Sequence, residues 1–402
     1  MNPKEKKRLK LFALVYIVTV VALALITIYY LQFTTSLRSQ VLTLYASEKN
    51  LRSTLNTKIS DLDRTKDQLD AMKQDDQYVR NNNLQKEIDS IQKTYKQSAT
   101  AYEDLLKLRE QTPKTGSFDK QYAHVLVELS KRNYDESSRL LDILQKGIAS
   151  ESAKLASSFA IPTNVATSNK APGTGYSRQK VTSDVGEFLV DIIAADLNST
   201  RIIADTTSDS TCGDNCPVMA LADYASRSGA YAAINGPYFC PAEYPSCSGK
   251  TNSFDTLLMN KNKVYFNSDN NIYSSVPAVI FSGGSARFVR ASSEWGRDTS
   301  PDSVIAGQPL LLFNGEIMFG GNDVAKQSSK GSRSFIGSAG STVYIGIVHN
   351  ASVAEVAHVL KTLGLANAIN LDSGGSTAFI SNGHYIAGPG RNLPIGILFV
   401  RK

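Results

Sequence analysis

The sequence predicts an α+β C-terminal domain with mixed β-sheets and few helices, preceded by a transmembrane helix and an α-helical coiled-coil stalk. Three observations indicate this class: an uncharged apolar run near the N-terminus, apolar residues at steps of three, four or seven after it, and short β-prone runs from about residue 180. The expected segments are a cytoplasmic basic tail (1–10), a transmembrane helix (11–31), a coiled-coil or helical stalk (36–158), a linker (161–180) and the C-terminal domain (181–402).

The formal net charge of +6 is unevenly distributed. Residues 161–402 hold 18 Lys and Arg against 18 Asp and Glu, so the whole excess lies in the first 160 residues. A domain without a basic excess lacks the electrostatic footprint of nucleic-acid binding. We therefore expect no nucleic-acid partner.

The apolar run "LFALVYIVTVVALALITIYYL" covers residues 11–31 without a charge. As a helix it is about 31 Å long, enough to span a bilayer. Five basic residues precede it, which predicts a single-pass protein with a cytoplasmic N-terminus and an extracytoplasmic C-terminal domain. A cleaved signal peptide is the alternative, but the run is long for one and no small-residue cleavage site follows.

The four cysteines, which lie beyond this run, are Cys212 and Cys216 in "CGDNC", and Cys240 and Cys247 in "CPAEYPSC". An even number of thiols outside a membrane indicates two disulfides. We expect local pairing within each motif, and the crossed pairings stay open. Neither spacing is the CxxC of a zinc site, which makes a four-cysteine zinc centre the weaker alternative.

The stalk has apolar residues in the a/d pattern of a coiled coil, from Leu37 to Val79, and a second register runs from Leu84 to Leu105. Polar residues interrupt the first seam, so homo-oligomerisation, in dimers or trimers, and folding back of the stalk both stay open. Pro113 and Gly116 predict a helix end, after which helical periodicity resumes. The following linker is rich in Pro, Gly, Ser and Thr.

The C-terminal domain combines turn signals with one clear helix. Asn-Gly pairs at 314–315 and 382–383 separate β-prone runs and predict hairpins. The helix after "STVYIGIVHN" opens with a Ser352 to Glu355 capping box and closes at Gly364. It lies between two strand-like runs, and so predicts a strand, helix, strand unit.

The stretch "AINLDSGGSTAF" (368–379) ends an apolar run with Asp372. Ligands collect where such strands end. The following residues let the backbone turn tightly and point N–H groups at one place, which suits an anion. A plain capped turn is the alternative for Asp372. The residues of this candidate nest are Gly374, Gly375, Ser376 and Thr377.

Four further stretches offer candidate side chains. In "AYAAINGPYF", Asn235 and Gly236 follow a buried run, and Tyr238 could stack on a sugar, although turn chemistry with core aromatics is an equal alternative. Arg333 in "GSRSFIG" and Arg391 in "GPGRNLPIG" have the planar fork that binds phosphate. His349, at the end of "YIGIVHN", is a candidate general acid or base.

The runs "INGPYF", "GQPLLLFNGE", "SRSFIG", "VHNASVAEVAHVLKTLGLANAINLDSGGSTAF" and "GRNLPIGILFV", in this order, resemble the phosphodiester glycosidase family. Its domain occurs in N-acetylglucosamine-1-phosphodiester alpha-N-acetylglucosaminidase and in bacterial relatives. The resemblance covers roughly residues 185–402. It implies hydrolysis of a sugar-1-phosphodiester. We hypothesise that Asp372 acts at the anomeric carbon or on the water. In this hypothesis Arg333 and the loop amides hold the phosphate, Asn235 orients the sugar and His349 transfers a proton.

The sequence departs from the family pattern at Pro237, Tyr238 and Ser373, among other positions. A catalytically inactive, membrane-tethered envelope glycan-binding or scaffold protein is therefore the alternative function. An extracytoplasmic location favours cell-envelope glycans or exopolysaccharides with sugar-phosphate links as substrates. The sequence requires no cofactor. A divalent cation near Asp372 stays an open alternative, although no spacing of His, Asp and Glu residues indicates one.

Overall fold

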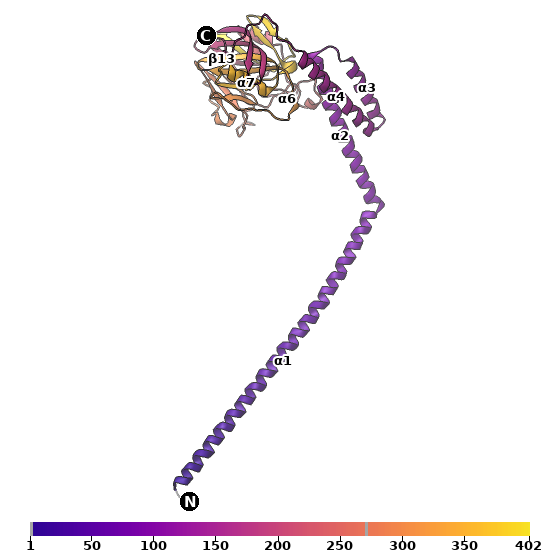
Figure 1. The fold of residues 1–402 in the computed structure, drawn as a ribbon, viewed down its shortest axis with the longest axis vertical. Coiled ribbons are helices and arrows are strands. Elements are labelled where there is room, and N and C mark those ends of the chain that lie inside the picture. Colours follow the sequence, from indigo (N-terminus) through magenta and orange to yellow (C-terminus); the bar gives the residue numbers. More distant parts are fainter. Residues whose placement is uncertain (1–2, 270–271) are drawn as a thin grey trace. The chain divides into compact units, whose positions relative to one another are not determined.

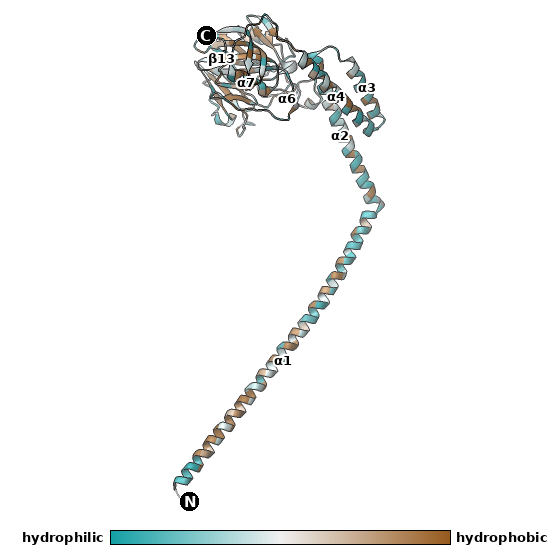
Figure 2. Ribbon diagram, viewed as in Figure 1, coloured by the Kyte–Doolittle hydropathy of each residue, from teal (hydrophilic) through white to brown (hydrophobic). Residues whose placement is uncertain are grey.

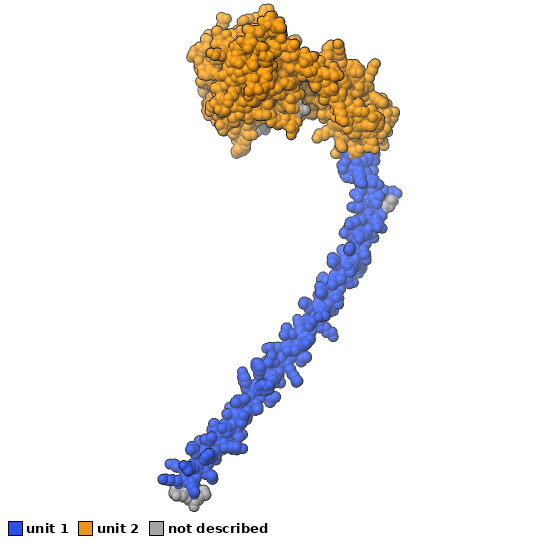
Figure 3. Space-filling view, viewed as in Figure 1, with its two compact units in different colours: residues 1–89 blue, residues 90–402 orange. Residues whose placement is uncertain are grey.

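The computed structural model describes residues 3–269 and 272–402. Met1 and Asn2 of the expected cytoplasmic tail lie outside the described residues. The chain divides into two compact units, residues 1–89 and 90–402, which Figure 3 distinguishes by colour.

The first unit is formed by α1 (Pro3–Gln74) and the beginning of α2 (Asp76–Gln111). Figure 2 shows the apolar run of α1 as a brown stretch near the N-terminus. This helix is long and apolar enough to cross a membrane, and a signal sequence would have the same character. The side chains of its expected coiled-coil seam are exposed. A coiled coil needs a second helix on that seam, so self-association stays a prediction.

The second unit begins with a small helical core. The end of α2 packs with α3 (Gly116–Ser130) and α4 (Tyr134–Ser158), and buries an apolar cluster between them. Gln97 of α2 donates a hydrogen bond to Asp142 of α4. The break at residues 112–115 is the one that Pro113 and Gly116 predict. Leu105, Leu108, Val125, Leu141 and Leu144 are fully buried in this cluster.

Three antiparallel sheets make up the rest of the second unit (Figure 1), which confirms the α+β class. In sheet order, the first has β1 (Gly175–Ser183), β2 (Gly186–Asp196), β13 (Thr342–Ala351), β12 (Gly331–Ala339), β14 (Asn367–Asn370), β10 (Leu310–Phe313) and β11 (Glu316–Ile317). The second has β16 (His384–Ala387), β15 (Phe379–Ser381), β4 (Ala232–Asn235), β17 (Ile395–Arg401) and β3 (Thr200–Thr206). The third has β6 (Tyr265–Phe266), β5 (Leu258–Met259), β9 (Ser303–Ala306), β7 (Ala278–Ser282) and β8 (Ser285–Val289).

The central strands are buried on both faces. Along β13, Val343, Ile345 and Ile347 face the main core, which takes side chains from all three sheets, while Tyr344 and Val348 face a second core. The helix α7 (Val353–Thr362) covers that second core, and α5 (Leu221–Ser228) covers the outer face of the second sheet. Burial on both faces explains why these strands read as continuous apolar runs rather than alternating ones.

The predicted strand, helix, strand unit is present as β13, α7 and β14. Its two strands are not neighbours, because β12 lies between them and pairs antiparallel with both. Residues 331–339 therefore lie beside the end of β14, and this position brings Arg333 to the neighbourhood of Asp372.

The hairpins and the helix cap that the sequence predicts are present. Asn314 and Asn382 have positive φ at the two predicted hairpins, and the Ser352 to Glu355 capping box has both of its hydrogen bonds. The strand β1 begins at Gly175, inside the expected linker. As an outer strand of the first sheet it is only partly buried, with four of its nine residues exposed. It therefore lacks the apolar pattern that predicts a strand.

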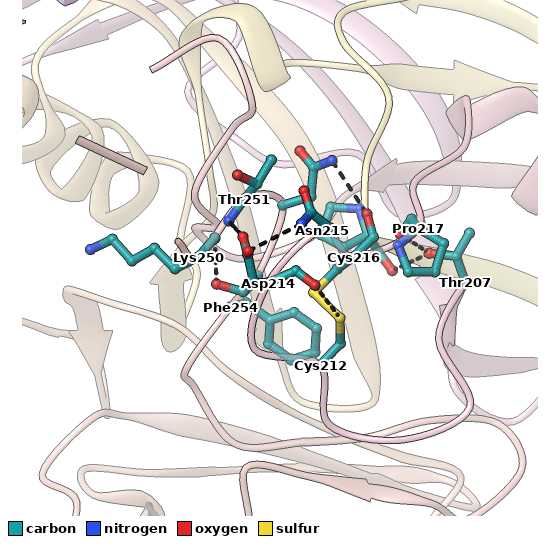
Figure 4. The surroundings of a disulfide bond; sticks show 12 residues. Thr207, Cys212, Asp214, Asn215, Cys216, Pro217, Lys250, Thr251 and Phe254 are labelled. Carbon is teal, nitrogen blue, oxygen red and sulfur yellow. Dashed lines mark hydrogen bonds between the residues drawn. A yellow bond between two sulfur atoms is a disulfide. The ribbon is translucent and has the colours of Figure 1, made fainter. Parts of the chain in front are cut away.

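The expected local disulfides, Cys212–Cys216 and Cys240–Cys247, are both formed. Figure 4 shows the surroundings of the first disulfide, where the Asp214 carboxylate accepts a hydrogen bond of 2.6 Å from the Thr251 N–H. The Cys216 N–H donates to the Thr251 carbonyl in return. The two bridges therefore brace one another across residues 247–252.

Removing the second bridge, by changing Cys240 and Cys247 together to Ser, should lower the free energy of unfolding by about 2–3 kcal/mol. The reason is that a cross-link closing a loop of this length restricts the unfolded chain by about that amount. Chemical unfolding of oxidised wild type and double variant checks this value. A difference below about 0.5 kcal/mol, with reduced wild type equally unaffected, would contradict it.

Candidate active site

A cavity of about 260 Å³, here called the Asp372 cavity, lies where β12 begins and β14 ends, next to the C-terminal end of α2. Of the residues predicted for a site, it is lined by Asp372, Arg333, Tyr238, Gly374, Ser376 and Arg391. The predicted residues outside the described lining are Asn235, Gly236, Gly375, Thr377 and His349.

Asp372 is the most perturbed carboxylate of the cavity. Asp372 lies just beyond the C-terminal end of β14, an interior strand of the sheet, and only 7% of the residue is exposed. Burial raises its pKa to about 6, although the Ser376 side chain and the Ser373 N–H, at 2.8 Å, donate hydrogen bonds that favour the charged form. A carboxyl group poised near neutral pH can exchange protons with a substrate or water.

Asn235 holds the backbone at Asp372 rather than reaching into the cavity. Its Nδ2 donates to the Asp372 carbonyl at 2.6 Å, and its Oδ1 accepts from the Ser334 hydroxyl at 2.9 Å and from the Ala378 N–H at 3.3 Å. The Asp372 N–H in turn donates to the Gly236 carbonyl. One fully buried amide thus joins the ends of β4, β12 and β14.

Ser373, one of the departures from the family pattern, also has a structural partner. Its hydroxyl accepts the Ser334 N–H at 3.2 Å and donates to the Leu371 carbonyl at 3.4 Å. The side chain therefore helps to hold the β12 end against the Asp372 loop while lining the cavity.

Arg333 lines the cavity from β12, but most of its N–H groups donate hydrogen bonds to other groups of the protein. Its guanidinium donates to the carbonyls of Lys326, Ser329 and Ala351. Burial lowers its pKa, and Tyr238 and Asp372 act in the opposite direction. Only 6% of the residue is exposed, so its charge acts on a cavity largely screened from water.

The predicted anion nest is occupied by a side chain from the helical part of the unit. Glu110, at the end of α2, forms an ion pair with Arg391 and accepts a hydrogen bond from the Gly375 N–H. Burial raises the pKa of Glu110, although Arg391 and Gly375 both favour its charged form. A carboxylate therefore occupies two of the donors that the sequence predicts for an anion, Arg391 and the Gly375 N–H.

Changing Glu110 to Ala should raise the affinity of the cavity for inorganic phosphate by about tenfold, because Arg391 and the Gly375 N–H lose their competing anion. Isothermal titration with phosphate measures this change. Glu87→Ala, on an exposed position of the same helix, is the matched control. Unchanged or weaker binding would mean that Glu110 instead holds Arg391 in place for the ligand.

His349 lies behind the cavity. Its Nε2 is 2.7 Å from Asp191 Oδ2 and its Nδ1 is 3.3 Å from the hydroxyl of Ser332, which lines the cavity. Tyr176 donates its hydroxyl proton to the other Asp191 oxygen. Burial acts to raise the pKa of Asp191, but the hydrogen bonds from His349 and Tyr176 outweigh it and hold the pKa below its usual value.

Several residues that line the cavity could not be identified from the sequence. They include Glu110 and Lys107 of α2, and Lys250, Lys326 and Lys330. Nothing in the local pattern distinguishes them from solvated surface charges, since tertiary packing alone brings them together. Among the described residues that line the cavity are two carboxylates, Glu110 and Asp372, and six basic side chains. The basic ones are Lys107, Lys250, Lys326, Lys330, Arg333 and Arg391.

The cavity therefore has the charge expected of a site for anions. Within the described parts of the chain, no group of three or more His, Cys, Asp and Glu side chains is arranged to hold a metal ion.

Comparison with known proteins gives a family for this domain. Residues 228–400 match the family model described as phosphodiester glycosidase. No curated protein sequence matches the chain. Similar solved structures include the zebrafish N-acetylglucosamine-1-phosphodiester alpha-N-acetylglucosaminidase catalytic domain auto-inhibited by pro-peptide, at 16% identity, 59% coverage of this chain, 87% of that chain and a TM-score of 0.45. A hypothetical protein from Synechocystis is 14% identical, with 56% and 62% covered and a TM-score of 0.39.

The family match includes the loop with Asp372, the strand with Arg333 and the loop with Arg391, which the structure brings to one cavity. Residues 228–400 therefore form a domain of the phosphodiester glycosidase family.

Proposed function

We propose that the chain is a membrane-anchored, extracytoplasmic hydrolase that cleaves the glycosidic bond of sugar-1-phosphodiesters in cell-envelope glycans. The observation that carries this proposal is Asp372, a buried carboxylate with a pKa of about 6 in a cavity lined by six basic side chains. The family match of residues 228–400 supports the reaction class.

In the proposed reaction the bond between the anomeric carbon and the phosphate oxygen breaks, and its electron pair leaves with the phosphate. A water oxygen bonds to the anomeric carbon, and ionised Asp372 accepts the proton of that water and later releases it to solvent. The products are the free sugar and a phosphomonoester. The phosphate is a weakly basic leaving group, so its departure needs little protonation, and the charge that develops on it needs fixed cations instead.

The cationic side chains that can stabilise this charge differ in how freely they can move. Arg333 is committed to backbone carbonyls and contributes its charge from a fixed position. Lys326 interacts electrostatically with Asp372 and lies over the Tyr244 ring at 5.5 Å, and it is more exposed. We assign to Arg333 the role of holding the phosphate from a fixed position. We assign to Lys326 the role of moving with the phosphate as it leaves.

The N-terminal helix and the disulfides support the proposed location. The apolar run of α1, preceded by basic residues, supports a membrane anchor with a cytoplasmic N-terminus. Two disulfides with no free cysteine in the described chain support an oxidising compartment for the second unit. We therefore propose envelope polymers with sugar-phosphate links as the substrates.

The test uses the full-length protein in detergent with a panel of sugar-1-phosphate diesters in water enriched in ¹⁸O. We expect free sugar that carries the label and a phosphomonoester that does not. Label in the phosphate would indicate cleavage of the phosphorus–oxygen bond and would overturn the glycosidase assignment.

A second candidate, a glycan-binding protein without turnover, is favoured by one observation. Glu110 is already paired with Arg391 and the Gly375 N–H, and most of the N–H groups of Arg333 donate to backbone carbonyls. Few of these groups are therefore free to act on a substrate. If the panel gives no product but a diester raises the melting temperature of the protein, binding without hydrolysis replaces the proposed activity.

A further inference from the structure

We propose that a second, larger cavity beside α4 binds further units of an anionic glycan chain whose cleaved end lies in the Asp372 cavity. This inference rests on the proposed function and specifies its substrate as a polymer rather than a small diester. The larger cavity, here called the α4 cavity, has a volume of about 630 Å³.

The two cavities adjoin. The α4 cavity lies between the helices α2 and α4, the segment at residues 326–330 and Asn350. Five residues line both cavities, which means that a ligand leaving one along this border enters the other. These shared residues are Lys107, Gln111, Lys326, Ser329 and Lys330.

The size of the cavities favours an extended ligand. Pockets for drug-sized ligands usually have about 300–1,000 Å³. The Asp372 cavity, at about 260 Å³, is below this range, whereas the α4 cavity is well inside it. The reacting cavity alone therefore suits one sugar phosphate, and the second cavity has room for the units that follow.

The lining of the α4 cavity suits sugars. Gln145 and Asn350 offer amide groups and Ser152 offers a hydroxyl, which can donate to and accept from sugar hydroxyls. The methyl groups of Ala149 and Ala153 offer apolar surface for the C–H faces of sugar rings. None of the described residues that line it is aromatic, so the stacking platform expected for a nucleobase is missing.

The shared border suits an anion. Lys107 is paired with Asp104 at 2.7 Å, and Lys330 with Glu355 at 2.8 Å, so these two charges are already balanced. Lys326 lies over the Tyr244 ring and forms no ion pair within 4.0 Å with a carboxylate among the described residues. Its charge is therefore available to a phosphate that links a unit in one cavity to a unit in the other.

The occupation of the α4 cavity can be tested by filling it. Ala153→Trp places an indole there from an exposed position of α4, and Lys154→Trp, on the same helix but outside both cavities, is the matched control. The full-length protein in detergent is assayed with a methyl diester of the sugar 1-phosphate and with an oligomer of about six sugar-phosphate repeats.

We expect wild type to show a kcat/KM for the oligomer at least about tenfold above that for the methyl diester. Ala153→Trp should reduce the oligomer value by about tenfold and leave the methyl diester value unchanged, and Lys154→Trp should change neither. Equal values for both substrates in wild type, or an equal loss for both in Ala153→Trp, would overturn the inference while leaving the proposed activity intact.

If neither substrate is hydrolysed, the proposed function fails and binding decides the inference separately. Titration of wild type with the oligomer should then show binding that Ala153→Trp weakens about tenfold and that Lys326→Gln makes less dependent on salt. Binding that is the same in wild type and Ala153→Trp would overturn the α4 cavity as a glycan site.

Discussion

Changing Asp372 to Asn should reduce turnover of a sugar-1-phosphodiester by about 10³-fold or more, while the protein becomes more stable at neutral pH. The loss of turnover follows because an amide can neither accept the proton of the attacking water nor balance positive charge at the anomeric carbon. The gain in stability follows because the charged carboxylate is buried.

The sign of the pH dependence follows from the raised pKa. In the unfolded chain the pKa of Asp372 is close to 4, whereas in the folded protein burial raises it to about 6. The folded state therefore binds the proton more tightly, and its stability falls as pH rises from about 4 to about 6. Two pKa units correspond to about 3 kcal/mol. Asp372→Asn should therefore raise the free energy of unfolding by about 3 kcal/mol above pH 6, and should leave it nearly unchanged near pH 4.

Chemical unfolding at pH 4 and pH 8, together with kcat/KM against pH, checks both parts. Wild-type kcat/KM should decline below about pH 6 as Asp372 becomes protonated. Asp209→Asn, at an exposed position, serves as the control and should change neither property. Retained turnover in Asp372→Asn would remove this residue from the chemistry, and an equal stability change at both pH values would contradict the assigned pKa.

Changing Asn235 to Ala should lower the free energy of unfolding by about 3–4 kcal/mol. The fully buried amide makes hydrogen bonds to the Asp372 carbonyl, the Ser334 hydroxyl and the Ala378 N–H. Each such bond contributes about 1 kcal/mol, and partners left without a bond in a buried place add to the loss. Thermal and urea unfolding measure the effect.

Ser334→Ala is the matched comparison, because it removes only one of these bonds and should lower the stability by about 1 kcal/mol. The double variant should be less destabilised than the sum of the two, since both changes remove the same bond between the side chains. If Asn235→Ala instead keeps its stability and raises KM, the amide binds substrate, as the family resemblance implies, and does not hold the site together.

Local features of the fold could be predicted from the sequence because neighbouring residues determine them. The hairpins at Asn314 and Asn382, the capping box at Ser352 and the pairing within each cysteine motif depend on interactions over a few residues. The place of Asp372 at the end of a strand was predictable for the same reason.

The surroundings of Asp372 were less predictable. Glu110 and Lys107 reach the cavity through the packing of α2, more than 250 residues earlier in the chain, and no local pattern records that contact. Asn235 was expected to face a sugar, but the sequence could not show that its amide would be fully buried between three strand ends. The strand β1 was hidden because an outer strand that is only partly buried needs few apolar residues.

The place of β2 between β1 and β13 has a consequence for synthesis of the protein. Asp196 of β2 pairs with Thr342 of β13, so the ribosome adds about 150 residues between the two partners. At 5–20 residues per second, this interval lasts on the order of 10–30 s. Throughout it, β2 pairs only with β1, because β13, its other neighbour in the sheet, has not yet been made. The nascent chain must therefore be shielded over residues 186–196 until the second half arrives, and this segment is the one from which aggregation of an incomplete or slowly made chain should begin.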